Sequence, residues 1–266
     1  MAVWARRPAT PRGSLLLVHG RTWSSRPDFD LRVPGFERSV LSSLAGSGFA
    51  AYAVDLRGYG ETLRDRTGWL TPWQSATDVR NVLAWVAARH PRLPPPALLG
   101  WSRGGAIAML VAQTDPRRLS ALVLFGFVFD PAAPYVDGPA PARPPRLKNT
   151  AESAASDFVS PAVTPPIVIE TFVKEALSRD PVTADLRNDT EFNVLDPARV
   201  TVPTLVLYGD RDINVPPPDG PRFLSRLATA DKQLVELRGA DHVAQLEDTH
   251  DAWIAAVVSF LSRPRR

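Results

Sequence analysis

A serine between glycines is the first feature of this sequence that could do chemistry. Residues 100–104 read Gly-Trp-Ser-Arg-Gly, after the apolar run 96–99 and before a helical pattern. A serine on a tight strand-to-helix turn exposes its hydroxyl, and the N–H groups that open the helix can stabilise a developing negative oxygen. Ser102 is therefore the candidate nucleophile of an acyl transfer. Alternatively, Ser102 only caps the helix and the glycines only allow close packing.

A serine hydroxyl needs a general base near neutral pH, and the sequence offers four histidines. We favour His242, because in LRGADHVAQLE it follows a strand and a glycine turn and would lie in a loop above the sheet. His90 ends a helix, where it would face solvent or interact with the helix dipole. His250 falls in the first turn of the last helix, and we expect it at the surface.

The base needs a carboxylate that orients it, and the preferred residue is Asp212. It lies in the loop after the strand VPTLVLYG, together with Asp210. Either aspartate could instead cap the turn or pair with the arginine between them. Asp130, which follows another strand, is the alternative acid. With Asp212 the chain order is serine, acid, histidine, which is typical of a nucleophile on a strand-to-helix turn and differs from both common protease orders.

Short apolar runs that alternate with amphipathic stretches must position these residues. The six runs are 14–20, 48–58, 96–100, 119–127, 203–209 and 232–239. This alternation predicts the α/β class, with a mostly parallel central sheet and helices on both faces. One helix should begin at Thr71, because Pro72 suits the first helical position and Gln74 completes a capping box.

The alternation stops between about residues 130 and 199. DPAAPYVDGPAPARPPR is too rich in proline for a helix or strand, whereas PPIVIETFVKEALSRDP reads as an isolated amphipathic helix. Because the segment leaves after one core strand and returns before another, we expect it over the carboxyl ends of the strands. The predicted organisation is a core of residues 1–130 and 200–266 with an inserted helical, proline-rich lid of residues 131–199.

These motifs together resemble the α/β-hydrolase superfamily over nearly all of the chain outside the insertion. VHGR is similar to the His-Gly turn of that family, DLRGYGET to its structural Asp-x-x-Gly-x-Gly turn, VPTLVLYGDRD to its acid-bearing strand, and ADHVAQLE to its base loop. In the last motif Glu247 stands where the family often has an acidic residue. The resemblance implies an oxyanion hole made by the backbone N–H groups of Arg21 and Arg103. The short leader before residue 15 implies that one or both of the opening antiparallel strands are shortened or missing.

The resemblance and the residue chemistry imply a serine esterase with a small-molecule ester as substrate. Ser102 would attack the carbonyl, His242 would take the proton, and Asp212 would hold the imidazole. Thioester, lactone or carbon–carbon hydrolysis, perhydrolysis and acyl transfer to another acceptor remain open on the same fold. A receptor that keeps the triad to hold a small ligand is an alternative of another class. Nucleophilic-aspartate members are disfavoured because position 102 is serine.

The substrate pocket is less defined by the sequence. Trp23 and Trp101 are the candidate substrate-binding residues, although aromatic side chains mainly fill protein interiors. Further aromatic residues that could line a pocket are Trp69, Trp73, Tyr135, Phe158 and Phe172. Arg21 or Arg103 could pair with a carboxylate of the substrate.

Composition excludes several other classes of protein. The hydrophobic share of 44% and the charged share of 22% are typical of a packed globular domain. A net charge of +3 is too small to indicate nucleic acid binding. With four histidines and no cysteine we expect no metal and no cofactor. The apolar stretch 15–18 is too short for a secretory or membrane segment, so we expect a cytoplasmic protein with no membrane span.

Overall fold

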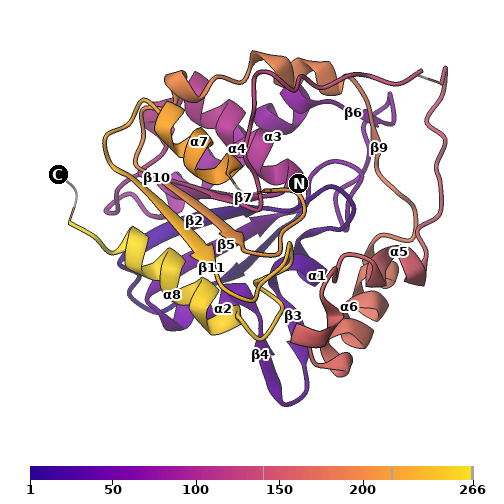
Figure 1. Ribbon diagram of the computed structural model, residues 1–266, viewed down its shortest axis with the longest axis horizontal. Coiled ribbons are helices and arrows are strands. Elements are labelled where there is room, and N and C mark those ends of the chain that lie inside the picture. The colour runs from indigo at the N-terminus through magenta and orange to yellow at the C-terminus, as the bar shows by residue number, and fades with distance from the viewer. Residues whose placement is uncertain (140, 217, 265–266) are drawn as a thin grey trace.

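A seven-stranded sheet forms the centre of the computed structural model, which describes residues 1–139, 141–216 and 218–264 (Figure 1). The strand order is β1-β5-β2-β7-β8-β10-β11. The bounds are β1 Val3–Arg6, β2 Gly13–Val18, β5 Phe49–Val54, β7 Ala97–Trp101, β8 Leu122–Phe125, β10 Thr204–Gly209 and β11 Lys232–Leu237. The six apolar runs are the six parallel strands, so the predicted α/β class is confirmed.

The strand β1 is the one antiparallel member of this sheet among the described residues. It is four residues long and pairs with β5 from Val3 opposite Val54 to Arg6 opposite Ala51. The stretch before β2 therefore supplies one short antiparallel edge strand.

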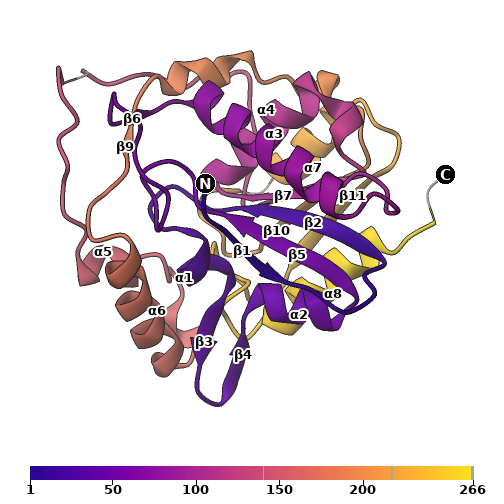
Figure 2. The same cartoon turned by 180° about the vertical axis from the view of Figure 1, so that it is seen from behind.

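Helices cover both faces of the sheet. α3 (Pro72–Arg89), α4 (Arg103–Thr114) and α7 (Asp219–Arg226) lie on one face, and α2 (Val40–Gly46) and α8 (His250–Leu261) lie on the other (Figures 1 and 2). In β2, Leu16 and Val18 enter the core beneath α3 and α4, whereas Leu15 and Leu17 enter the core beneath α2 and α8. Successive strand residues point to opposite faces, so a strand that is buried on both sides must be apolar throughout.

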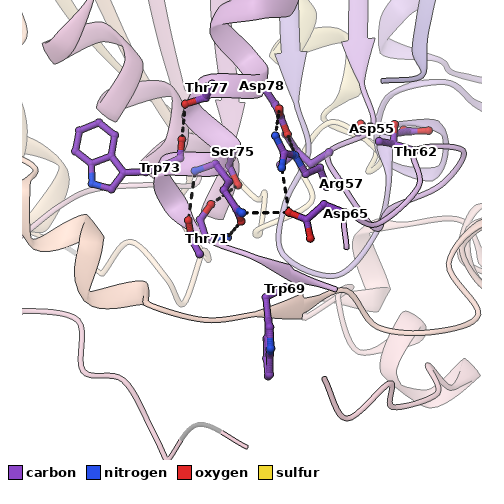
Figure 3. A network of polar contacts seen from close by, with 12 residues as sticks. Asp55, Arg57, Thr62, Asp65, Trp69, Thr71, Trp73, Ser75, Thr77 and Asp78 are labelled. Carbon is purple, nitrogen blue, oxygen red and sulfur yellow. Dashed lines mark hydrogen bonds and ion pairs between the residues drawn. The ribbon is translucent and has the colours of Figure 1, made fainter. Parts of the chain in front are cut away.

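A capping box begins α3 as predicted. The Thr71 hydroxyl accepts the Gln74 N–H, and the Gln74 side chain accepts the Thr71 N–H. Beside it, Arg57 forms ion pairs with Asp78 at 2.6 Å and with Asp65 at 3.1 Å, as Figure 3 shows. A capping residue of this kind stabilises a helix by about 1 kcal/mol. The network ties the loop after β5 to the start of α3.

The segment 131–199 contains short helices and little sheet. Its elements are α5 (Ala151–Ala155), α6 (Pro166–Arg179), the strand β9 (Asp185–Leu186) and three 3-10 turns, Pro161–Val163, Asp189–Val194 and Pro197–Arg199. The expected amphipathic helix is α6, and its buried face consists of Val168, Phe172 and Ala176. α5 and α6 lie side by side, next to α1 (Ser25–Phe29) and β3 (Leu31–Val33) (Figures 1 and 2).

Small elements complete the chain. β3 forms a hairpin with β4 (Phe36–Arg38), β6 (Trp69–Leu70) pairs in parallel with β9, and a 3-10 turn spans Pro116–Arg118. The pairing of β6 with β9 joins the segment 131–199 to the connection that follows β5. None of the helices in the described parts of the chain has the length and apolar character that a membrane-spanning segment requires.

Candidate active site

The Gly-Trp-Ser-Arg-Gly turn forms a sharp elbow between β7 and α4. Ser102 has φ 53° and ψ −121°, which is a strained conformation for a residue with a side chain. A Cβ on Gly100 would overlap the backbone of Gly104, and a Cβ on Gly104 would overlap the backbone of Val18 and His19. Both glycines are therefore required by close backbone contacts. The elbow presents Ser102 at the carboxyl ends of the strands.

His242 and Asp212 form a hydrogen-bonded pair. Nδ1 of His242 lies 3.0 Å from each carboxylate oxygen of Asp212, whose side chain is completely buried. The Asn214 N–H donates to the same carboxylate at 2.8 Å. With Nδ1–H directed at the carboxylate, Nε2 of His242 is free to accept a proton.

Trp101 joins this pair to the elbow. Its indole N–H donates to the His242 carbonyl at 2.9 Å, and the two rings lie 5.4 Å apart. Because Trp101 directly precedes Ser102, the base loop is held next to the elbow. The Ser102 hydroxyl itself forms no hydrogen bond within the described parts of the chain, and such contacts are often loose before substrate binds.

Gly126, just after β8, packs against both members of the His242–Asp212 pair. Its φ is +56°, and an added Cβ would lie 3.0 Å from the His242 ring and 3.2 Å from the Asp212 carboxylate. We expect Gly126→Ala to displace the imidazole and to lower kcat about a hundredfold, because small errors in position are costly in catalysis. Hydrolysis rates and the melting temperature of the purified variant test this.

Gly35→Ala is the matched control for that variant. Gly35 has φ +80° with nothing within 4 Å of the added Cβ, so the substitution strains the backbone without touching the candidate site. We expect Gly35→Ala to reduce stability and to keep the activity of the folded protein. Equal activity losses in the two variants would contradict the role given to Gly126.

The two candidate oxyanion donors are Arg21, in the loop after β2, and Arg103, the first residue of α4. Gly20, which precedes Arg21, packs on the Trp101 ring, where an added Cβ would lie 3.2 Å from the ring atoms. Gly104, which follows Arg103, packs on the backbone that leads into the same turn. The N–H groups of Arg21 and Arg103 donate no hydrogen bond within the described residues. The two side chains differ: Arg103 is buried against Asp189, and Arg21 is exposed.

Two residues, Asp130 and His250, do not lie where the sequence suggested. Asp130 pairs with Arg226 at 3.2 Å and with Arg222 at 3.7 Å, so the structure brings Asp212 and not Asp130 to His242. His250 is only 1% exposed, and the surface position expected for it is wrong. Its ring contacts the Gln245 carbonyl at 2.6 Å and the Ser43 hydroxyl at 3.0 Å.

The other two histidines have structural contacts. His19 is fully buried, with Nδ1 donating to the Gly20 carbonyl and Nε2 accepting the Leu56 N–H. Burial lowers the pKa of His19 to about 4, so its ring is neutral near pH 7. His90 ends α3 as expected, and its Nε2 lies 2.8 Å from the Tyr52 hydroxyl.

Acidic side chains near the site were missed by the sequence analysis. The indole N–H of Trp23 donates to Asp157 at 2.7 Å, across 134 residues of chain, and Trp23 itself is only 1% exposed. Asp28 lies nearby, fully buried, and accepts the Gly20 N–H at 3.3 Å. Burial raises the pKa of Asp28 well above its usual range and the pKa of Asp157 to about 6. No local sequence pattern signals these contacts, because they depend on how the segment 131–199 packs.

The raised pKa of Asp157 predicts a dependence of stability on pH. The folded state holds the proton of Asp157 more tightly than the unfolded state, so stability falls as pH rises between about 4 and 6. The loss is complete above pH 6 and is at most about 3 kcal/mol. We expect Asp157→Asn to raise the melting temperature at pH 8 and to raise it much less at pH 4.5.

Glu152→Gln serves as the control, because it removes an exposed carboxylate from the neighbouring helix α5. Melting curves of both variants at the two pH values test the assignment. A gain for Asp157→Asn that is equal at both values would show that charge burial is not its cause.

Glu247 stabilises the loop that carries His242. Its carboxyl group accepts the Asp241 N–H at 3.1 Å, and burial raises the pKa of Glu247 to about 9. Asp241 in turn accepts the N–H of Ser160 at 2.5 Å and that of Val243 at 3.0 Å. These contacts fix the loop that carries His242 and tie it to the segment 131–199.

One protein family and two known proteins are similar to this chain over most of its length. The family model described as serine aminopeptidase, S33, matches residues 9–249. A monoacylglycerol lipase of Mycolicibacterium smegmatis is 27% identical over 252 residues, which cover 87% of this chain and 81% of that protein. A thermostable monoacylglycerol lipase of Bacillus sp. strain H-257 is 24% identical over 252 residues, 94% of this chain and 90% of that protein.

A solved structure shows the shared fold. The enol-lactonase from Burkholderia xenovorans LB400 superposes with a TM-score of 0.66 at 19% identity, and the match covers 98% of this chain and 96% of that one. At this identity the likeness concerns the fold alone.

Proposed function

The chain belongs to the S33 serine aminopeptidase family of the α/β-hydrolase superfamily and is a hydrolase, and we propose that it cleaves carboxylic esters through an acyl-enzyme on Ser102. The observation that carries this proposal is the His242–Asp212 pair, which Trp101 holds beside the elbow that presents Ser102. The lipase names of two relatives support an ester as substrate. The proposed substrate is a small molecule.

In the proposed reaction, Oγ of Ser102 attacks the ester carbonyl while Nε2 of His242 takes its proton. Asp212 holds Nδ1–H and stabilises the imidazolium that forms. The backbone N–H groups of Arg21 and Arg103 stabilise the tetrahedral oxyanion. The imidazolium then protonates the leaving alcohol, and water, activated by His242, releases the acid from Ser102.

We further propose that residues 131–199 act as a lid over this site, inserted into a core of residues 1–130 and 200–266. The Ser160–Asp241 hydrogen bond supports this, because it links the segment directly to the base loop. Trp101 would form the floor beneath the reacting groups. Trp23, which is buried, would act on the substrate only through Asp157, the carboxylate that it holds.

A hydrolysis screen tests the reaction class. The purified protein is assayed with nitrophenyl esters of increasing acyl length, monoacylglycerols, lactones, thioesters and amides, each with and without prior treatment with a serine-directed inhibitor. The proposal predicts inhibitor-sensitive ester hydrolysis as the fastest reaction. Faster turnover of thioesters, lactones or amides would replace the ester assignment with that chemistry, and binding without any turnover would favour a receptor.

A further inference from the structure

The two arginines at the proposed oxyanion hole, Arg21 and Arg103, have different partners. The guanidinium of Arg103 is 8% exposed, lies 2.8 Å from Asp189 and packs 5.0 Å from the centre of the Phe192 ring. Arg21 is exposed, and within the described residues it forms no ion pair. Arg103 is therefore already neutralised inside the protein. Arg21 keeps an unpaired positive charge beside the proposed oxyanion hole.

Arg21 lines a pocket of about 210 Å³. Thr22 and Trp69 also line this pocket, together with Pro145, Leu147 and Leu186 of the segment 131–199. Figure 3 shows the Trp69 side chain pointing away from the polar network around Asp65. Besides Arg21, Asp185 and two threonines, the residues that line this pocket are apolar.

The acidic residue in this pocket does not cancel the charge of Arg21. Asp185 is only 5% exposed, and Arg64 contacts its carboxylate at 2.6 Å. The backbone N–H of Arg146 donates to the second carboxylate oxygen at 3.1 Å, and the Arg146 side chain lies 3.9 Å away. The balance of charge around the pocket is therefore positive.

The backbone of Arg21 is fixed close to the reacting groups. Its carbonyl accepts the hydroxyl of Tyr59, which is 1% exposed, and the preceding glycine packs on Trp101. A substrate whose carbonyl oxygen meets the Arg21 N–H would thus lie within one side-chain length of the Arg21 guanidinium. A carboxylate elsewhere on that substrate could reach it.

Carboxyl groups also lie close to the turn that carries Arg21. Asp28 accepts the N–H of Gly20, Asp157 accepts the indole N–H of Trp23, and Asp180 accepts the N–H groups of Ser24 and Gly60. These acids offer no positive partner for an anion. A carboxylate on the substrate would therefore need the Arg21 guanidinium as its partner.

We infer that Arg21 is a specificity-determining residue. It selects esters whose acyl chain carries a carboxylate and enters the pocket lined by Arg21 and Trp69. This inference rests on the proposed ester hydrolysis at Ser102. A guanidinium binds a carboxylate through two parallel hydrogen bonds, and the apolar walls would strengthen them by limiting water. Because the Arg21 side chain is exposed to water, we expect a preference of only about tenfold for the anionic ester over the neutral one. The preference should be smaller at high salt.

The test compares two nitrophenyl esters of similar length, one ending in a carboxylate and one in a methyl group: nitrophenyl hydrogen glutarate and nitrophenyl pentanoate. The quantity measured is the ratio of kcat/KM for the anionic ester to that for the neutral ester. We expect Arg21→Met to lower this ratio about tenfold, mainly through KM, and Arg21→Lys to restore part of it. The control Arg66→Met removes an exposed positive charge outside the pocket and should leave the ratio unchanged.

Binding to the Ser102→Ala protein separates this inference from the proposed function. Both intact esters are titrated by calorimetry into Ser102→Ala and into Ser102→Ala with Arg21→Met. Weaker binding of the anionic ester alone in the double variant is the expected result, whether or not the wild type hydrolyses esters. Equal ratios in wild type and Arg21→Met, or equal binding to the two Ser102→Ala proteins, would overturn the assignment of Arg21 and leave ester hydrolysis standing.

Discussion

Ser102→Ala should lower kcat for ester hydrolysis by about 10⁵-fold, because the proposed acyl-enzyme cannot form without the hydroxyl. The hydroxyl forms no hydrogen bond within the described residues, so its removal leaves no buried group unsatisfied there. Alanine tolerates the positive φ of this position no worse than serine does. We therefore expect a melting temperature within a few degrees of the wild type.

Rates from concentrated enzyme and melting curves test this prediction together. Titration with an intact ester should show that the variant still binds substrate. A loss of less than tenfold in kcat, in a folded variant, would mean that the reaction does not pass through Ser102.

Asp212→Asn should lower kcat by about 10³- to 10⁴-fold with a smaller effect on KM. Asparagine has the shape of aspartate, but its amide N–H₂ can face Nδ1 of His242 and favour the tautomer with the proton on Nε2. That tautomer cannot accept the proton of Ser102. The measurement is the profile of kcat against pH for the purified variant, whose rate should rise at high pH where hydroxide can replace the base.

Two controls separate Asp212 from the other acids considered for its role. Asp210 lies in the same loop and accepts the Gly239 N–H at 2.8 Å, and Asp130 pairs with two surface arginines. We expect Asp210→Asn and Asp130→Asn to keep kcat within a few fold of the wild type. A loss in Asp130→Asn as large as that in Asp212→Asn would contradict the assignment of the acid.

The sequence was sufficient to predict those parts of the fold that depend on local patterns. A strand buried on both faces must be apolar at every position, and all six parallel strands were recognisable for that reason. The helix α3 was marked by the capping residues Thr71 and Gln74. Ser102, Asp212 and His242 each follow a recognisable strand, so the topology of a parallel sheet predicts that they meet at one edge.

Features that depend on contacts between distant segments could not be predicted in this way. The burial of His250 arises because the start of α8 packs against Ser43 of α2, 207 residues earlier. Asp157 meets Trp23 only because α5 and α6 pack beside α1. The pairing of β6 with β9 involves two residues on each side, too few for any sequence pattern. The lid role of residues 131–199 and the cytoplasmic location stay predictions.

Labelling with a fluorophosphonate, followed by mass spectrometry of the digested protein, shows whether Ser102 is the nucleophile. We expect one adduct, on the peptide that contains Ser102. It should be absent when the protein is denatured before labelling, and it should form far more slowly in Asp212→Asn. Ester hydrolysis that continues with Ser102 unlabelled, or an adduct on another residue that abolishes activity, would contradict the assignment of Ser102.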